Sequence, residues 1–156
     1  MSILQVVKGS PLFYELYDQE IMEIVEKCRV LNLQPEDAIF KEGDTGDEIY
    51  LILNGSAEVR KGEISLAKLR KGDLFGEMVL LKENTRKADI VCSNFCDVLV
   101  MKYGDLFGLY ETNQKVFSLI MLNLARLMAT RLNKAGESIR VLATENHELK
   151  GGKKAA

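Results

Sequence analysis

The sequence predicts a mainly β protein with flanking helices: an antiparallel β-roll, similar to a jelly roll, between a short N-terminal helix and a long C-terminal helix. Short apolar runs separated by Gly-Asp and Asn-Gly turns fill the middle of the chain, and helical periodicity precedes and follows them. The 156 residues are 47% hydrophobic, which suits one domain with a real core. We therefore expect an N-terminal helical segment at 1–29, a β-roll at 30–102, a hinge helix and long helix at 103–149, and a disordered tail at 150–156.

The first predicted element is a helix within 12–28, because apolar residues recur there at helical spacing. Asp18, just before the run QEIMEIVEK, is the expected N-cap. The apolar positions of this helix are Leu16, Ile21, Ile24 and Val25.

The predicted strands of the β-roll are the runs AIF, EIYLIL, SAEVRK, ISLAKL, ADIVC and DVLVMK. Two tight turns, Asn54-Gly55 and Lys61-Gly62, join three of these runs in succession. Asn-Gly and Lys-Gly turns are typical of β-hairpins, so we expect the three strands to form a meander.

After the β-roll, YGDLFGLY is predicted to form one short helix, and Asn113 is predicted to cap a long one. Apolar residues follow steps of three and four from Phe117 to Leu142. A small barrel cannot cover such a helix from about Leu132 onward, so we expect it to pair with a second copy and form a homodimer. The alternative is a helix folded wholly against its own barrel.

Composition argues against several classes of function. The chain has 21 basic and 23 acidic residues, a net charge of −2, whereas nucleic-acid binders usually carry a basic excess. No apolar run reaches the roughly 18 residues of a membrane span, and Met1 to Ser10 does not look like a signal peptide. We expect a cytoplasmic protein that does not contact a membrane.

The reactive side chains predict neither a metal site nor an enzyme. His147 is the single histidine, so no histidine cluster and no catalytic triad can be assembled. Cys28, Cys92 and Cys96 lack metal-type spacing, and we expect them to be reduced and largely buried.

The stretch FGEMVLLKENTRKAD, residues 75–89, predicts a ligand site. Gly76 and Glu77 would begin a single helical turn whose first amide groups attract an anion, and Arg86 could complete a phosphate site. A carboxylate beside a phosphate requires a neutral donor between them, and a sugar hydroxyl is one. The ligand that satisfies both charges is a nucleotide.

The same stretch resembles the phosphate-binding cassette of the cyclic nucleotide-binding domain family, which includes catabolite activator protein and the regulatory subunits of cyclic-AMP-dependent kinase. The upstream run FKEGDTGDEIYLILNGSAEV is also similar to this family. The resemblance implies that Glu77 accepts the ribose 2′-hydroxyl of cyclic AMP, or next of cyclic GMP, and that Arg86 binds the cyclic phosphate. It further implies a cradle of backbone amides near Gly76, Met78, Val79, Lys87 and Ala88.

Three features depart from the family's pattern. Thr85 stands where proline is common, and Asp89 stands where serine or threonine is frequent. Asp89 either faces the pocket, near the phosphate or a guanine edge, or faces solvent. Ala135 and Gly136 offer no polar side chains where relatives contact the base, so base selectivity stays open.

Three functional alternatives remain. The first is a sensor that binds a cyclic nucleotide and acts on an effector protein in trans through its long helix. The second is a degenerate docking module independent of nucleotide, suggested by Asp89 and the apolar base contact. For Glu77 and Arg86 themselves, the alternative to ligand binding is a mutual salt bridge on an ordinary loop. The third, a DNA-binding regulator, would need roughly 20 residues of helix-turn-helix beyond Leu149, so we expect no direct DNA binding unless the sequence is a fragment.

Overall fold

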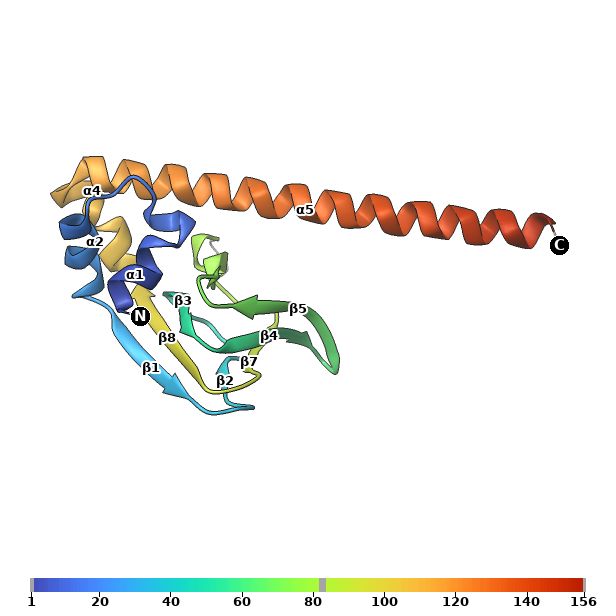
Figure 1. Cartoon of the computed structure of the whole chain (residues 1–156), viewed down its shortest axis with the longest axis horizontal. Helices are drawn as coiled ribbons and strands as arrows, with labels where there is room; N and C mark the ends of the chain where they lie inside the picture. The colour runs from blue at the N-terminus through green and yellow to red at the C-terminus, as the bar shows by residue number, and fades with distance from the viewer. Residues whose placement is uncertain (1, 82–83, 156) are drawn as a thin grey trace.

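The computed structural model describes residues 2–81 and 84–155 and contains two antiparallel four-stranded sheets that form a β-roll (Figure 1). The predicted fold class is confirmed. In spatial order the first sheet comprises β1 (Arg29–Leu33), β8 (Cys96–Lys102), β3 (Glu48–Asn54) and β6 (Leu74–Phe75). The second comprises β2 (Ala38–Phe40), β7 (Asp89–Cys92), β4 (Ser56–Lys61) and β5 (Ile64–Arg70).

The predicted three-stranded meander is wrong at its first turn. β4 and β5 do form a hairpin, but β3 pairs with β6 and β8 in the other sheet. Only Gly55 separates β3 from β4, which is too short for a two-residue hairpin turn. Gly55 has a φ of 84°, and the chain turns there from one sheet to the other.

Strand alternation in β3 and β8 builds two cores. Successive side chains of a strand point to opposite faces. Ile49, Leu51 and Leu53 of β3 therefore pack with the helices, whereas Tyr50 and Ile52 pack between the two sheets. Because both faces of β3 are covered, nearly the whole strand is buried, as its continuous apolar run EIYLIL indicates.

The N-terminal segment is helical but divided into three pieces. They are α1 (Ile3–Lys8), the 3-10 helix η1 (Pro11–Phe13) and α2 (Asp18–Val25). A positive φ of 70° at Glu15, between η1 and α2, interrupts the helix predicted within 12–28. Asp18 is the first residue of α2 and not its cap; the Tyr17 N–H instead donates to Glu20 Oε1 at 2.9 Å.

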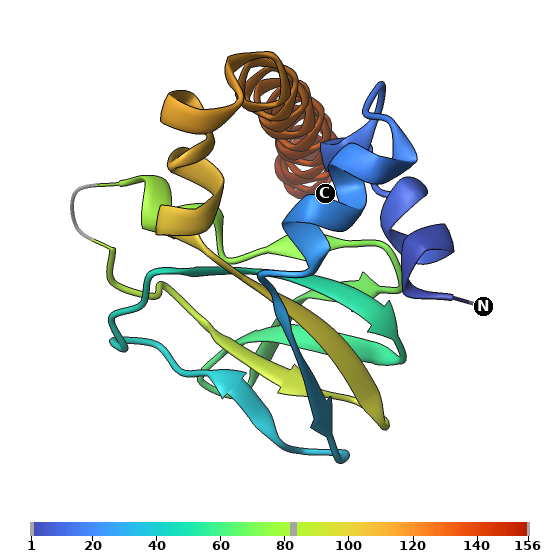
Figure 2. The ribbon, with the colours of Figure 1, turned by 90° about the vertical axis from the view of Figure 1, so that its left-hand side faces the viewer.

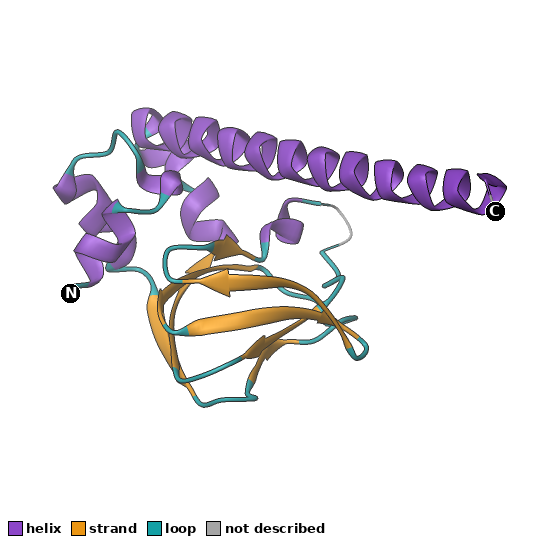
Figure 3. Ribbon diagram, turned by 45° about the vertical axis from the view of Figure 1, so that its right-hand side comes forward, coloured by secondary structure: helices purple, strands orange, loops and turns teal. Residues whose placement is uncertain are grey.

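The hinge region contains two short helices where one was predicted, α3 (Tyr103–Phe107) and α4 (Leu109–Thr112), divided at Gly108. The predicted cap of the long helix is confirmed, since Asn113 Oδ1 accepts from the Val116 N–H at 3.2 Å. α5 (Gln114–Ala155) extends far beyond the β-roll (Figure 3). It also includes residues 150–155, which were expected to be disordered. A helix that is already formed is extended more easily than a new one is nucleated, even through the poor helix formers Gly151 and Gly152.

The first part of α5 is tied to the N-terminal segment, which lies beside it in the end-on view (Figure 2). The buried Asn123 amide donates to the carbonyl oxygens of Leu12 and Tyr14 at 3.1 and 2.8 Å. Lys115 pairs with Glu20 at 3.1 Å. These contacts hold α5 in place over the β-roll, where it passes the predicted ligand site.

No helix in the described part of the chain is both long enough and apolar enough to cross a lipid bilayer.

Candidate functional site

The predicted site residues surround a cavity of about 510 Å³ between the second sheet and α5. Six of the seven lie on its wall: Gly76, Glu77, Met78, Arg86, Lys87 and Ala88. The seventh, Val79, is 7% exposed and belongs to the core between the helices and the first sheet. The Val79 side chain therefore packs away from the cavity.

Arg86 is buried, with only 2% of its surface exposed. Its Nη1 donates to the Gly76 carbonyl at 3.0 Å and its Nη2 to the Glu48 carbonyl at 2.9 Å. The guanidinium carbon also lies 4.3 Å from the centre of the Phe40 ring, a cation–π contact. Burial and then the Glu48 carboxylate raise the pKa of nearby Tyr50, which stays neutral beside the cation.

Two glycines, Gly46 and Gly76, leave room for the side chains of Arg86 and Tyr50. A Cβ on Gly46 would lie 2.6 Å from Arg86 Nη2, so no larger residue fits there without displacing the arginine. Gly76 has a φ of 88°, and a Cβ there would lie 2.9 Å from the Tyr50 ring. Gly76 thus has a structural requirement besides the predicted one: the turn and the packing of Tyr50 require a glycine here, whether or not a ligand approaches the backbone.

Arg86 has no anionic partner among residues 2–81 and 84–155, since none of their carboxylates lies within ion-pairing distance of it. A buried, unpaired charge is costly. Arginine carries five N–H donors, and the two carbonyls of Gly76 and Glu48 use two of them. The remaining donors can bind an anion that enters the cavity.

Backbone donors lie beside this cation. The 3-10 helix η2 (Glu77–Leu80) follows Gly76 directly, as a single turn was predicted to do. The N–H groups of Glu77 and Met78 find no backbone acceptor within the described residues, whereas that of Val79 donates to the Gly76 carbonyl at 3.3 Å. These two amides and the guanidinium line the same cavity, and together they favour the binding of an anion with several oxygens, such as a phosphate.

Glu77 does not pair with Arg86. Its Oε1 instead lies 3.0 Å from Nη1 of Arg131, which belongs to α5. The second Arg131 nitrogen, Nη2, donates to the Leu74 carbonyl. The mutual salt bridge of Glu77 and Arg86 considered above is therefore absent from the described structure, and Glu77 links the cassette to the long helix.

Two cavity residues on α5, Arg131 and Lys134, were not predicted from the sequence. They are three positions apart, so both side chains lie on one helix face. That spacing was visible in the sequence, but the resemblance pointed to Ala135 and Gly136, which do not line the cavity. The helix therefore contributes two cations where no polar group was expected.

Asp89 is turned away from the site. Its Oδ1 accepts from the Glu42 N–H at 2.7 Å, and its neighbours Ala88 and Ile90 line the cavity while Asp89 does not. It therefore places no negative charge against a bound anion. Thr85, at the position of the family's proline, forms an isolated antiparallel bridge with Thr45.

Part of the cavity wall is apolar and is built from Val59, Leu69, Phe75 and Ile90. Such a combination, apolar walls with a few convergent polar groups, is typical of small-ligand sites. The described residues contain no cluster of three metal-ligating side chains.

Comparison with known proteins also indicates a site for a nucleotide. The sequence pattern of the "Cyclic nucleotide-binding domain" matches residues 30–113, more than half of the chain. The cyclic AMP receptor protein of Thermus thermophilus is 32% identical over 145 residues, which cover 89% of this chain and 65% of that protein. A cGMP-dependent protein kinase of Toxoplasma gondii is 37% identical over 88 residues, covering 56% of this chain and 9% of the kinase.

Among solved structures, the crystal structure of the catabolite activator protein of Thermus thermophilus superposes with a TM-score of 0.73 at 31% identity. The match covers 86% of this chain and 63% of that one. The chain thus spans less than two thirds of the length of each of these relatives.

Proposed function

Because the chain belongs to the cyclic nucleotide-binding domain family, we propose that it is a regulatory sensor that binds a cyclic mononucleotide in the cavity at Arg86. The observation that carries this proposal is a buried guanidinium that faces the cavity without a carboxylate partner among the described residues. The proposed role is binding and not catalysis.

Each group of the site has a proposed part in holding the nucleotide. Arg86 binds the exocyclic oxygens of the cyclic phosphate, assisted by the backbone amides around Gly76 to Val79 and Lys87 to Ala88. Glu77 accepts the ribose 2′-hydroxyl. A carboxylate offers about four lone-pair positions, so Glu77 can do this while it remains paired with Arg131.

We propose cyclic AMP as the ligand, with cyclic GMP next. A relative that matches 89% of this chain is named for cyclic AMP, whereas a cGMP-dependent kinase matches 56% of it. The base would lie against the apolar wall, and the side chains of Arg131 and Lys134 would be the first polar groups of α5 to approach it.

The bound nucleotide is proposed to act on α5. Arg131 pairs with Glu77 in the cassette, so a shift of the cassette around the phosphate pulls on the helix directly. The hinge helices α3 and α4 connect the β-roll to α5 and would absorb the change. The ligand shifts this equilibrium only if it binds one arrangement more tightly than the other.

The output is proposed to include homodimerisation through the distal half of α5 and an effector protein in the cytoplasm. Leu132, Ile139, Leu142 and Leu149 are each at least 64% exposed. Their spacing of seven, three and seven residues is that of a coiled-coil seam, so a second copy would bury them.

One observation favours the alternative, a docking module that does not bind nucleotide. The Glu77 carboxylate is already ion-paired with Arg131, and the Arg86 guanidinium already donates hydrogen bonds to two carbonyl oxygens. In this alternative the cavity stays without a nucleotide.

Thermal melting with cyclic AMP, with cyclic GMP and with neither separates the two functions. A ligand at a hundredfold excess over its Kd should stabilise the chain by about 2.7 kcal/mol. An unchanged melting temperature with both nucleotides would favour the docking module and overturn the sensor.

A further inference from the structure

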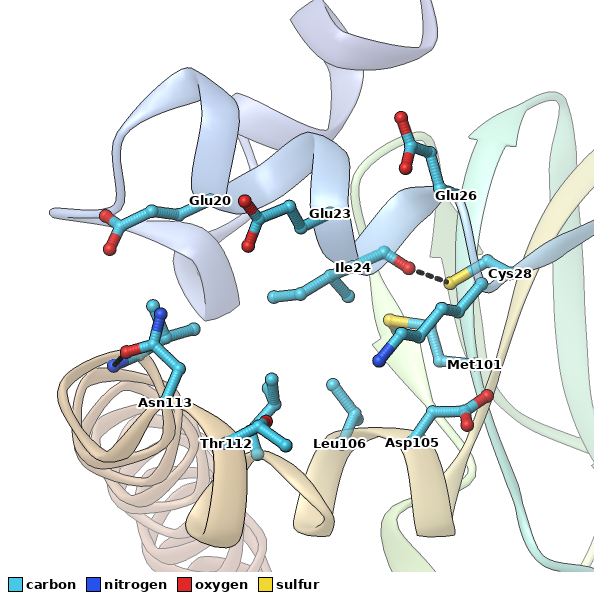
Figure 4. A pocket seen from close by; sticks show the side chains of 13 residues that line it. Glu20, Glu23, Ile24, Glu26, Cys28, Met101, Asp105, Leu106, Thr112 and Asn113 are labelled. Carbon is cyan, nitrogen blue, oxygen red and sulfur yellow. Dashed lines mark hydrogen bonds between the residues drawn. The ribbon is translucent and has the colours of Figure 1, made fainter.

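A second cavity, of about 350 Å³, lies away from Arg86 between α2 and the hinge helices (Figure 4). We propose that it is a docking site for a basic segment of a partner protein that inserts one apolar side chain. Helix α2 forms one wall, and α3, α4 and the start of α5 form the other.

Part of the inner surface of this cavity is apolar. Ile24, Met101, Leu106 and Val116 are each no more than 6% exposed and belong to the core between the helices and the first sheet. Figure 4 places Ile24 and Leu106 on opposite walls. At the lower end of the size range of binding pockets, the space suits a single apolar side chain rather than the face of a helix.

The rim is acidic. Glu23 of α2, Glu26 just after α2 and Asp105 of α3 line the cavity, and none of them has an ion-pair partner among the described residues. Within the described lining, Lys27 supplies the one positive charge. A fourth acid, Glu20, is already neutralised by Lys115 at 3.1 Å.

The arrangement of charge and apolar surface identifies the occupant. An apolar side chain inserted between the helices would bury its surface against the core, while lysines or arginines beside it would meet Glu23, Glu26 and Asp105. Complementary charge of this kind speeds association and selects the partner. Acidic and uncharged segments lack that complement.

One wall of the cavity, formed by α3, α4 and the start of α5, consists of the elements that the proposed nucleotide switch would move. Bound nucleotide would therefore change the affinity of the chain for a partner held between α2 and the hinge helices. The bound partner would change the affinity for nucleotide by the same factor. This coupling rests on the proposed function, whereas the docking itself does not. Binding is accordingly measured first without nucleotide.

The test uses a fluorescein-labelled hexapeptide with a central leucine flanked by lysines, titrated with the full chain and followed by fluorescence anisotropy. The double variant Glu23→Lys/Glu26→Lys should weaken binding by about tenfold or more, because both exposed positions then repel the peptide. The control variant Glu145→Lys/Glu148→Lys makes the same charge change at the same spacing on the distal part of α5 and should leave binding unchanged. A peptide with asparagine in place of leucine should also bind about tenfold less tightly, because it lacks the apolar anchor.

Absence of binding to the wild-type chain, equal weakening by the two double variants, or full retention of binding by the asparagine peptide would each overturn the docking site. Circular dichroism melts of both double variants confirm that they are folded. If the peptide binds but cyclic nucleotides do not, the docking site stands and the sensor fails. If cyclic nucleotides bind but the peptide does not, the sensor stands and the docking site fails.

Discussion

Replacement of Arg86 by alanine is expected to remove most of the nucleotide affinity. The guanidinium has donors left after its bonds to Gly76 and Glu48, and in the proposed complex two of them bind the phosphate. A hydrogen bond to a charged group contributes about 1.5 to 3 kcal/mol, so the loss of both should cost about 3 kcal/mol or more. A loss of 3 kcal/mol corresponds to about a 150-fold higher Kd.

Arg86→Ala also affects the fold, because the carbonyls of Gly76 and Glu48 lose their donor. That loss should lower the free energy of unfolding by about 1 to 3 kcal/mol without nucleotide. Affinity is therefore measured by isothermal titration calorimetry at a temperature where the melting curve shows the variant to be folded. Lys87→Ala is the matched control: this neighbouring side chain is exposed, and only its backbone has a proposed contact, so its Kd should stay near the wild-type value.

A folded Arg86→Ala protein that binds cyclic AMP within threefold of the wild-type affinity would refute the role of Arg86. An equal loss of affinity in Lys87→Ala would do the same, because it would indicate a general effect of positive charge.

Four further predictions concern other parts of the molecule. Arg131→Ala breaks a partly exposed ion pair to Glu77 worth about 1 kcal/mol or less. Nucleotide should therefore still bind, but it should no longer change the rate of proteolysis of α5; a persisting change would exclude Arg131 as the link. The hydrogen bond from the Tyr17 N–H, and to a smaller extent Lys115, lowers the pKa of Glu20 from its ordinary 4.5. The ionised form of Glu20 therefore stabilises the fold above pH 4.5, and this contribution is lost as the pH falls through the lowered pKa. Acid melts of Glu20→Gln should therefore decline less steeply below pH 4.5 than those of the wild type. Ile139→Asp should convert a dimer to a monomer in sedimentation velocity with little change in the melting of the β-roll, and an unchanged sedimentation coefficient would place the interface elsewhere. Burial raises the pKa of the Cys92 thiol to about 12, so iodoacetamide at pH 8 should label it only after unfolding in urea, as read by mass spectrometry.

The parts of the fold that could be predicted are those encoded by local pattern. The run EIYLIL identified β3 because a strand covered on both faces is apolar throughout. The capping carboxamide of Asn113 and the single helical turn that follows Gly76 likewise depend on neighbouring residues alone.

The errors arose where the outcome depends on distant residues. Asn54-Gly55 has the sequence of a hairpin, but β3 is already paired with β8, whose sequence lies more than forty positions later. The partner of Glu77 could not be predicted either, because Arg131 lies 54 positions away and only the path of α5 brings the two together. Asp89 was undecided for the same reason, since its hydrogen bond goes to the backbone of Glu42.

A crystal structure of the chain grown with cyclic AMP tests the central claim most directly. We predict electron density for the nucleotide in the cavity of about 510 Å³, with phosphate oxygens within hydrogen-bond distance of the Arg86 guanidinium and the ribose against Glu77. Nucleotide bound outside this cavity, or a cavity still without nucleotide at saturating cyclic AMP, would contradict the account.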